Sequence, residues 1–140
     1  MNKTRVSFSI LLLLLLALVA CGGAAPAVDS VAVDLSTLPD AVDVATVQSL
    51  KGDSEVVVID VREQWEYDAG HIPGVTLIPM NDVPARLSEI PTDKTVIVTC
   101  RSGNRSGQVT NFLRDQGYDN VHNMEGGILA WEAAGYSVEQ

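Results

Sequence analysis

The hydrophobic pattern beyond residue 40 consists of short apolar runs that are rich in β-branched residues. The two clearest runs are Val-Val-Val-Ile at 56–59 and Thr-Val-Ile-Val at 95–98. Runs of this length without alternating polar residues predict strands that are buried on both faces of a parallel sheet. Shorter runs at 42–44, 76–78 and 121–123 predict three further strands.

Segments with helical spacing lie between these runs. The clearest begins near residue 105 and places Val109, Phe112 and Leu113 on one face. It ends at Gly117, a residue type common at helix C-termini. The other predicted helices cover residues 45–51, 64–68, 83–90 and 128–134. Strands that alternate with helices predict an α/β fold, with a mostly parallel sheet of four or five strands and helices on both faces.

The first twenty residues have the pattern of an export signal. Lys3 and Arg5 precede an apolar stretch at 10–19 that is too short to cross a bilayer comfortably. The sequence Leu-Val-Ala-Cys at 18–21 resembles a bacterial lipobox, in which the cysteine receives a lipid and becomes the new N-terminus. Cys21 is therefore the predicted lipidation site, and its acyl chains would hold the protein on a membrane surface.

These features divide the chain into three parts. We expect a lipoprotein signal peptide at 1–20, a lipidated cysteine with a flexible tether at 21–40, and one domain at 41–140. The tether is composed of small and polar residues and has too little apolar surface to form a core. The predicted location is the bacterial cell envelope, with the domain outside the cytoplasm. An ordinary secretory signal cut near Ala20 or Ala25 is the alternative.

The composition is strongly acidic, with 18 acidic and 9 basic side chains and a net charge of −9. Removing Lys3 and Arg5 with the signal leaves 7 basic against 18 acidic side chains, a net charge of about −11. This balance argues against a nucleic-acid partner, because phosphate binding needs a basic surface. We expect a monomer that meets the membrane only through its lipid and that needs no cofactor or metal.

Cys100 and the six residues that follow it carry the main candidate chemistry. With Cys21 lipidated, Cys100 has no disulfide partner and is a candidate reactive thiol. Its place between a strand and a helix N-terminus offers unpaired N–H groups that stabilise an anion. Gly103 lets these groups converge, and Arg101 and Arg105 add positive charge. We therefore expect a thiol with a lowered pKa that acts as a nucleophile; a cysteine that only packs in the core is the alternative.

Four sequence segments extend this picture across residues 41–140. They are Asp-Val-Arg-Glu at 60–63 with Trp-Glu-Tyr at 65–67, Gly-His-Ile-Pro-Gly at 70–74, Cys-Arg-Ser-Gly-Asn-Arg-Ser at 100–106, and Gly126-Gly127 with Trp131. Together, in this order and spacing, they resemble the single-domain rhodanese-like sulfurtransferases. The one departure is Val75, where that family commonly has alanine.

The resemblance implies a single rhodanese-like domain that moves a sulfane sulfur through a persulfide. Cys100 would take the outer sulfur of a donor such as thiosulfate, release sulfite, and pass the sulfur to cyanide or a thiol. The residues implied to bind substrate around the persulfide are Arg101, Ser102, Gly103, Asn104, Arg105 and Ser106. The two arginines suit the sulfonate oxygens, because a planar guanidinium binds two oxygens at once.

Other residues of these segments have less defined roles. Asp60 and Arg62 either support the loop and line its mouth or form an ion pair at the strand end. His71 is expected to hydrogen-bond its own turn, because a thiolate stabilised by a helix and arginines needs no base. Three aromatic residues are expected in the core: Trp65, Phe112 and Trp131.

Two alternative functions stay open at this point. Cysteine phosphatases and arsenate reductases also combine a cysteine, an anion-binding loop and an arginine. Their arginine lies six positions after the cysteine, which is Ser106 here, whereas Arg105 comes one position earlier. The shorter loop favours one added sulfur atom over a phosphate group. The other alternative is a non-enzymatic or sulfur-carrier binding module at the cell envelope, and the presence of Cys100 argues for chemistry instead.

Overall fold

The computed structural model describes residues 33–140. The predicted signal peptide and the lipidation site lie outside the described residues. Residues 33–40, which we expected to belong to a flexible tether, are packed on the domain. A 3₁₀ turn, η1, spans Leu35–Thr37, and the side chains of Leu35 and Leu38 lie against the hydrophobic core. The folded part of the chain therefore starts before the predicted boundary.

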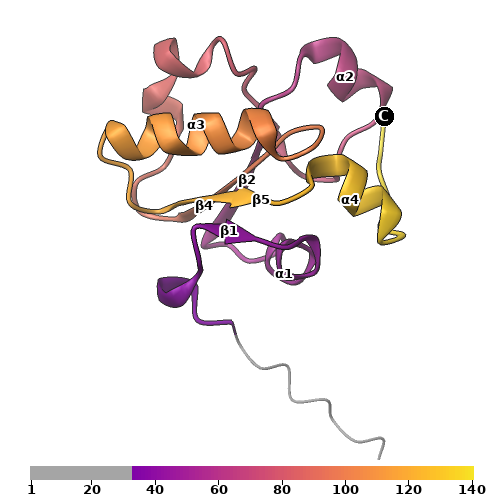
Figure 1. The fold of residues 1–140 in the computed structure, drawn as a ribbon, viewed down its shortest axis with the longest axis horizontal. Coiled ribbons are helices and arrows are strands. Elements are labelled where there is room, and N and C mark those ends of the chain that lie inside the picture. The colour runs from indigo at the N-terminus through magenta and orange to yellow at the C-terminus, as the bar shows by residue number, and fades with distance from the viewer. Residues whose placement is uncertain (1–32) are drawn as a thin grey trace, which may run out of the picture. The chain divides into compact units, whose positions relative to one another are not determined.

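Within residues 33–140, five strands form one parallel sheet in the order β1-β5-β4-β2-β3 (Figure 1). The strands are β1 (Ala41–Val42), β2 (Val56–Asp60), β3 (Thr76–Leu77), β4 (Thr95–Thr99) and β5 (Val121–Met124). This sheet confirms the predicted fold class. β2 and β4 are paired along their whole length, with Asp60 opposite Thr99. Because both strands end together, the residues that follow them meet at one edge of the sheet.

The α-helices of the described residues are α1 (Val44–Leu50), α2 (Gln64–Ala69), α3 (Asn104–Asp115) and α4 (Gly127–Ala133). The single helix predicted at 83–90 was wrong. Two 3₁₀ turns, η2 (Val83–Ala85) and η3 (Leu87–Glu89), occupy this segment, because the backbone leaves the helical region at Arg86 with φ −118° and ψ 22°. None of the helices described within 33–140 is long and apolar enough to cross a membrane.

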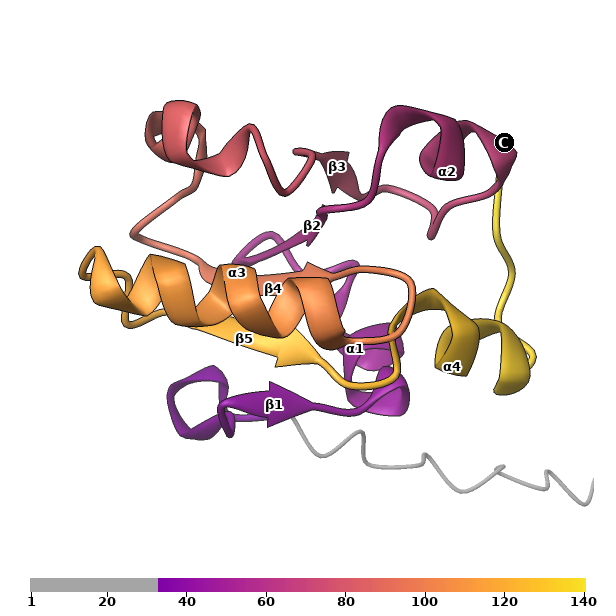
Figure 2. The ribbon, with the colours of Figure 1, turned by 45° about the horizontal axis from the view of Figure 1, so that its top comes forward.

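Helices cover both faces of the sheet, as predicted. Side chains alternate along a strand, so β4 sends Ile97 to one face and Val96 and Val98 to the other. The core on the side of Ile97 is completed by α1 and α4. The core on the other side is completed by η2 and by α3, which runs along β4 and β5 (Figure 2).

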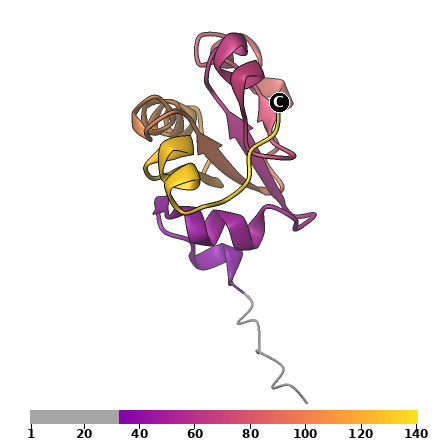
Figure 3. The ribbon, with the colours of Figure 1, turned by 90° about the vertical axis from the view of Figure 1, so that its right-hand side faces the viewer.

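The C-terminal segment returns from α4 to the turn that follows α2 (Figure 3). His71 and Glu139 exchange two backbone hydrogen bonds there, of 2.8 and 2.9 Å. The segment thus joins α4 to the turn after α2. These two helices border the loop that carries Cys100.

Candidate active site

Cys100 follows β4 directly, and α3 begins four residues later at Asn104. The loop thus joins the C-terminal end of a buried strand to the N-terminus of a 12-residue helix, as predicted. Gly103 is the residue before the helix and has φ 91°, a conformation that favours glycine. Ser102 and Asn104 are exposed. The sequence-based expectation of a strand, loop and helix around the thiol is confirmed.

The Cys100 side chain is buried beneath the loop and is hydrogen-bonded through its sulfur. The backbone N–H of Gly103 donates to Sγ over 3.2 Å, and the hydroxyl of Ser106 donates over 3.3 Å. Burial by itself raises the pKa of the Cys100 thiol. The hydrogen bonds of Ser106 and of the backbone at Ser102 and Gly103 outweigh burial, so the pKa is lowered from its ordinary value. The site therefore favours a thiolate.

Replacing Ser106 with alanine should raise the pKa of the Cys100 thiol, because the hydroxyl hydrogen bond lowers it. The thiolate fraction near neutral pH should fall, and the acid limb of the pH profile for alkylation by iodoacetamide should move to higher pH. Ser102→Ala is the matched control, because Ser102 acts through its backbone N–H, which alanine retains. An unchanged profile in Ser106→Ala would show that this hydroxyl does not stabilise the thiolate.

The N-terminus of α4 holds the cysteine loop through backbone hydrogen bonds. Ile128 N–H donates to the carbonyl of Cys100 over 2.8 Å, and Leu129 N–H donates to the carbonyl of Arg101 over 3.1 Å. Gly127 makes this approach possible, because a Cβ on it would lie 2.4 Å from the Cys100 carbonyl oxygen. In the sequence, Gly127 stands out only as part of the family resemblance. Its contact with the loop was not predicted.

Arg105 points to Glu66 on α2. Its two terminal nitrogens each donate to one carboxylate oxygen of Glu66 over 2.7 Å. This contact lowers the pKa of Glu66, which also caps α2 through the backbone of Glu63. The expected contact between Arg105 and a substrate sulfonate stays a prediction, for which three of the five guanidinium N–H donors are not engaged by Glu66. Sequence reasoning missed Glu66, which lies 39 residues away from its partner.

Arg101 is the loop arginine that is free to meet a ligand. Among the arginines of residues 33–140, the other four form ion pairs with carboxylates: Arg62, Arg86, Arg105 and Arg114. Arg101 forms none within this part of the chain and is exposed. Its guanidinium can therefore attract an anion without first breaking a contact.

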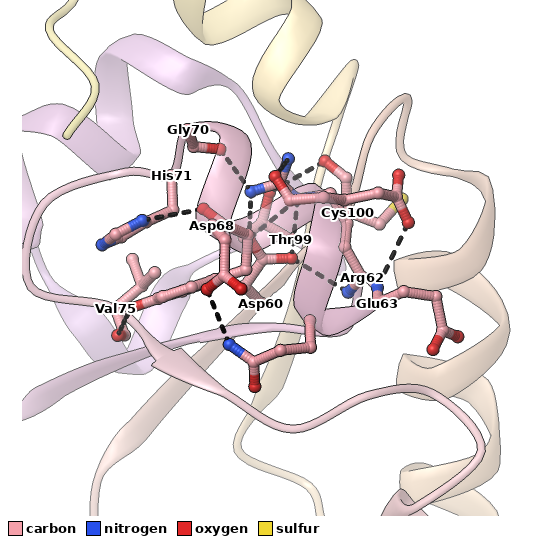
Figure 4. A network of polar contacts seen from close by, with 12 residues as sticks. Asp60, Arg62, Glu63, Asp68, Gly70, His71, Val75, Thr99 and Cys100 are labelled. Carbon is pink, nitrogen blue, oxygen red and sulfur yellow. Dashed lines mark hydrogen bonds and ion pairs between the residues drawn. The ribbon is translucent and has the colours of Figure 1, made fainter. Parts of the chain in front are cut away.

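Asp60 and Arg62 form a buried ion pair at the end of β2 (Figure 4). Arg62 Nη2 donates to Asp60 over 2.7 Å and to the carbonyl of Gly70 over 2.9 Å, while Nη1 donates to the carbonyl of Glu66 over 3.2 Å. Arg62 thereby ties the end of β2 to the middle of α2 and to the residue that follows it. It also lines the groove beside the loop. Both expectations for this pair thus have support in the geometry.

His71 hydrogen-bonds its own turn, as expected. Its Nδ1 lies 3.0 Å from the carbonyl oxygen of Tyr67, and the two rings stack at 3.7 Å. Of the aromatic residues expected in the core, Trp131 is buried and Phe112 packs against the core. The expectation for Trp65 was wrong, because it is 72 % exposed. The inner side of α2 is taken by Tyr67, which packs on the core, and by Glu66, which turns to Arg105.

A groove of about 270 Å³ opens beside the loop, between α2 and α4. Trp65 and Glu66 line it from α2, Leu129 and Glu132 line it from α4, and Arg101 lines it from the loop. Cys100 is not among the lining residues, since it is 1 % exposed. No cluster of three or more metal-ligating side chains occurs within residues 33–140.

The fold and this site define a class of protein: a parallel α/β domain that presents a stabilised cysteine at a helix N-terminus. The Rhodanese-like domain family matches residues 43–134. The chain therefore belongs to the rhodanese-like domain family.

Relatives and solved structures agree with this assignment. The chain is 42 % identical over 91 residues to a sulfurtransferase of Allochromatium vinosum, covering 65 % of this chain and 85 % of that protein. It is 33 % identical over 93 residues to a thiosulfate sulfurtransferase of Pseudoalteromonas translucida, covering 66 % and 89 %. A rhodanese-related protein from Thermoplasma volcanium has the same fold, with a TM-score of 0.65 and 31 % identity over 72 % of this chain and 98 % of that one. Sulfur transfer is the chemistry named for the Allochromatium vinosum and Pseudoalteromonas translucida relatives.

Proposed function

We propose that the protein is a sulfurtransferase that moves a sulfane sulfur from a donor such as thiosulfate to a thiophilic acceptor such as cyanide or a thiol. The observation that carries this proposal is the thiol of Cys100, whose sulfur accepts hydrogen bonds from Gly103 N–H and the Ser106 hydroxyl at a helix N-terminus. A relative that is named as a thiosulfate sulfurtransferase supports thiosulfate as the donor.

The reaction has two exchange steps at sulfur. In the first, the Cys100 thiolate attacks the outer sulfur of thiosulfate, the donor sulfur–sulfur bond breaks, and sulfite leaves with the bonding electrons. In the second, the acceptor attacks the outer sulfur of the persulfide, and Cys100 leaves as the thiolate. The N–H of Gly103 and the hydroxyl of Ser106 stabilise the negative charge on sulfur at the start and the end of the cycle. Arg101 attracts the anionic donor.

Mass spectrometry of the folded, reduced protein tests this function. After incubation with thiosulfate, the protein should gain the mass of one sulfur atom, and peptide mapping should place it on Cys100. Addition of cyanide should remove the added mass and produce thiocyanate. No adduct on folded protein would reject the proposed function. Transfer to cyanide no faster than from a small free persulfide would favour the non-enzymatic sulfur-carrier alternative.

We further propose that the domain is anchored at the bacterial cell envelope by a lipid on Cys21. The support is the basic, apolar and small-residue pattern of residues 1–21. Cells grown with labelled palmitate should incorporate the label into the wild-type protein and into Cys100→Ser, but not into Cys21→Ser. Cys100→Ser controls for the loss of a thiol in general. Wild-type protein without label would contradict lipidation.

A further inference from the structure

The groove beside the cysteine loop has a volume of about 270 Å³. Other hollows on the surface of residues 33–140 are as large or larger, so its volume does not indicate a ligand. Arg101 lines the groove and places it beside the cysteine loop. The side chains of its walls therefore decide what it can bind.

Both walls of the groove present exposed apolar side chains. Trp65 on α2 is 72 % exposed and Leu129 on α4 is 44 % exposed. Only four large hydrophobic residues are exposed within 33–140, and these two lie in the same groove. Large apolar side chains that lie together on a protein surface are typical of binding sites. Tryptophan adds a large and rigid contact area. The walls thus suit an apolar portion of a ligand.

The charge available to a ligand in the groove comes mainly from Arg101. The other charged groups near the loop are already paired, Arg62 with Asp60 and Glu66 with Arg105. Glu132, on the α4 wall, is the one further acidic residue of the lining and repels an anion from that side. An anionic group is therefore attracted to the end of the groove that Arg101 occupies, next to Cys100.

Hydrogen bonds fix both walls relative to the cysteine loop. The α2 wall is joined to it by the Glu66–Arg105 pair, and the α4 wall by Leu129 N–H, which donates to the Arg101 carbonyl over 3.1 Å. Trp65 directly precedes Glu66 in α2, so the Glu66–Arg105 pair also restrains its backbone. A groove with fixed walls binds a ligand that matches them with little loss of conformational order.

We propose that this groove is the acceptor site, and that it selects an organic thiol with an apolar chain and an anionic group. The anionic group and the thiol lie at the Arg101 end, with the anionic group paired to Arg101, and the apolar chain extends from there between Trp65 and Leu129. The acceptor thiolate attacks the outer sulfur of the Cys100 persulfide, the bond between that sulfur and Sγ breaks, and Cys100 leaves as a thiolate. The acceptor departs as a persulfide, so no external oxidant is needed. This inference rests on the proposed function.

Three thiols that carry the thiol on the carbon next to the carboxylate or hydroxymethyl group test the selection. The protein is first loaded with sulfur, the persulfide is verified by mass, and its loss is timed with 2-mercaptohexanoate, 2-mercaptopropionate or 2-mercaptohexan-1-ol. Transfer to 2-mercaptohexanoate should be about tenfold faster than to 2-mercaptopropionate, the gain expected when about half of the three added methylenes is buried. It should also be about threefold to fivefold faster than to 2-mercaptohexan-1-ol at low salt, because only the carboxylate pairs with Arg101.

Variants assign the two preferences to residues. Trp65→Ala and Leu129→Ala should each reduce the preference for the longer chain, whereas Arg101→Gln should reduce the preference for the carboxylate. The variants are loaded with polysulfide, so that recognition of thiosulfate does not enter the comparison. Val33→Ala is the control, because Val33 is an exposed apolar residue that does not line this groove. Circular dichroism checks that each variant is folded.

The outcomes separate this inference from the proposed function. Equal rates for the three thiols, or preferences that survive in Trp65→Ala and Arg101→Gln, would overturn the acceptor site while leaving sulfur transfer to cyanide intact. Failure of the wild type to form any persulfide with thiosulfate or polysulfide would overturn the proposed function itself. Preferences that disappear in the groove variants and persist in Val33→Ala would support the acceptor site.

Discussion

Replacing Cys100 with serine is expected to abolish both the sulfur adduct and thiocyanate formation, leaving no activity above the uncatalysed background. A serine hydroxyl is not ionised near neutral pH, and its oxygen cannot take part in thiol exchange. Cys100 is the one cysteine within residues 33–140, so no other thiol of this part of the chain can replace it. The measurement is thiocyanate production by equal concentrations of the two proteins, together with their intact masses.

The serine variant also separates loss of chemistry from loss of structure. Serine is close to cysteine in size, and its oxygen can still accept hydrogen bonds from Gly103 N–H and the Ser106 hydroxyl. The free energy of unfolding should change by on the order of 1 kcal/mol, so the thermal unfolding midpoint should stay within a few degrees of the wild type. Transfer that persists in Cys100→Ser would place the reaction elsewhere. Hydrolysis of an aryl phosphate by the wild type, lost in this variant, would favour the phosphatase alternative.

The strands and the cysteine loop could be predicted because their signals are local. Val56 to Ile59 and Thr95 to Val98 are unbroken apolar runs, and such runs are stable only when buried on both faces. The chemistry of the loop could be predicted because the loop lies between β4 and α3. The first N–H groups of a helix have no partner within the helix, and here they lie close to the side chain that follows the strand. Gly103 marks the conformation that this turn requires, with φ 91°.

Contacts between distant segments could not be predicted in the same way. Arg105 was expected to face the substrate because it lies near Cys100 in the sequence, yet Glu66 of α2 binds both of its terminal nitrogens. Nothing in the pattern around either residue specifies the other. Trp65 shows the same limit, because a large apolar residue can be buried or can line a groove. Only the orientation of α2 decides between the two.

Replacing Gly127 with alanine is expected to destabilise the domain strongly and to slow sulfur transfer. Gly127 has φ 57°, where a residue with a Cβ is strained by roughly 1–2 kcal/mol. The new Cβ would also lie 2.4 Å from the Cys100 carbonyl oxygen and 2.6 Å from the Arg101 carbonyl carbon, so the backbone must move. Overpacking of this kind adds about 1–3 kcal/mol. The sum predicts a loss of about 2–5 kcal/mol in the free energy of unfolding, measured by urea denaturation.

Gly135→Ala is the matched control for this substitution. Gly135 also has a positive φ, of 80°, but a Cβ there would meet nothing within 4 Å. The control should therefore show only the conformational strain, and the difference between the variants measures the close approach of α4 to the loop. The hydrogen bonds from Ile128 N–H and Leu129 N–H to the loop carbonyls depend on this close approach. Moving α4 away from the loop should therefore displace both Arg101 and the sulfur of Cys100. Equal losses of stability in the two variants, with equal rates of persulfide formation, would mean that α4 does not hold the loop in place.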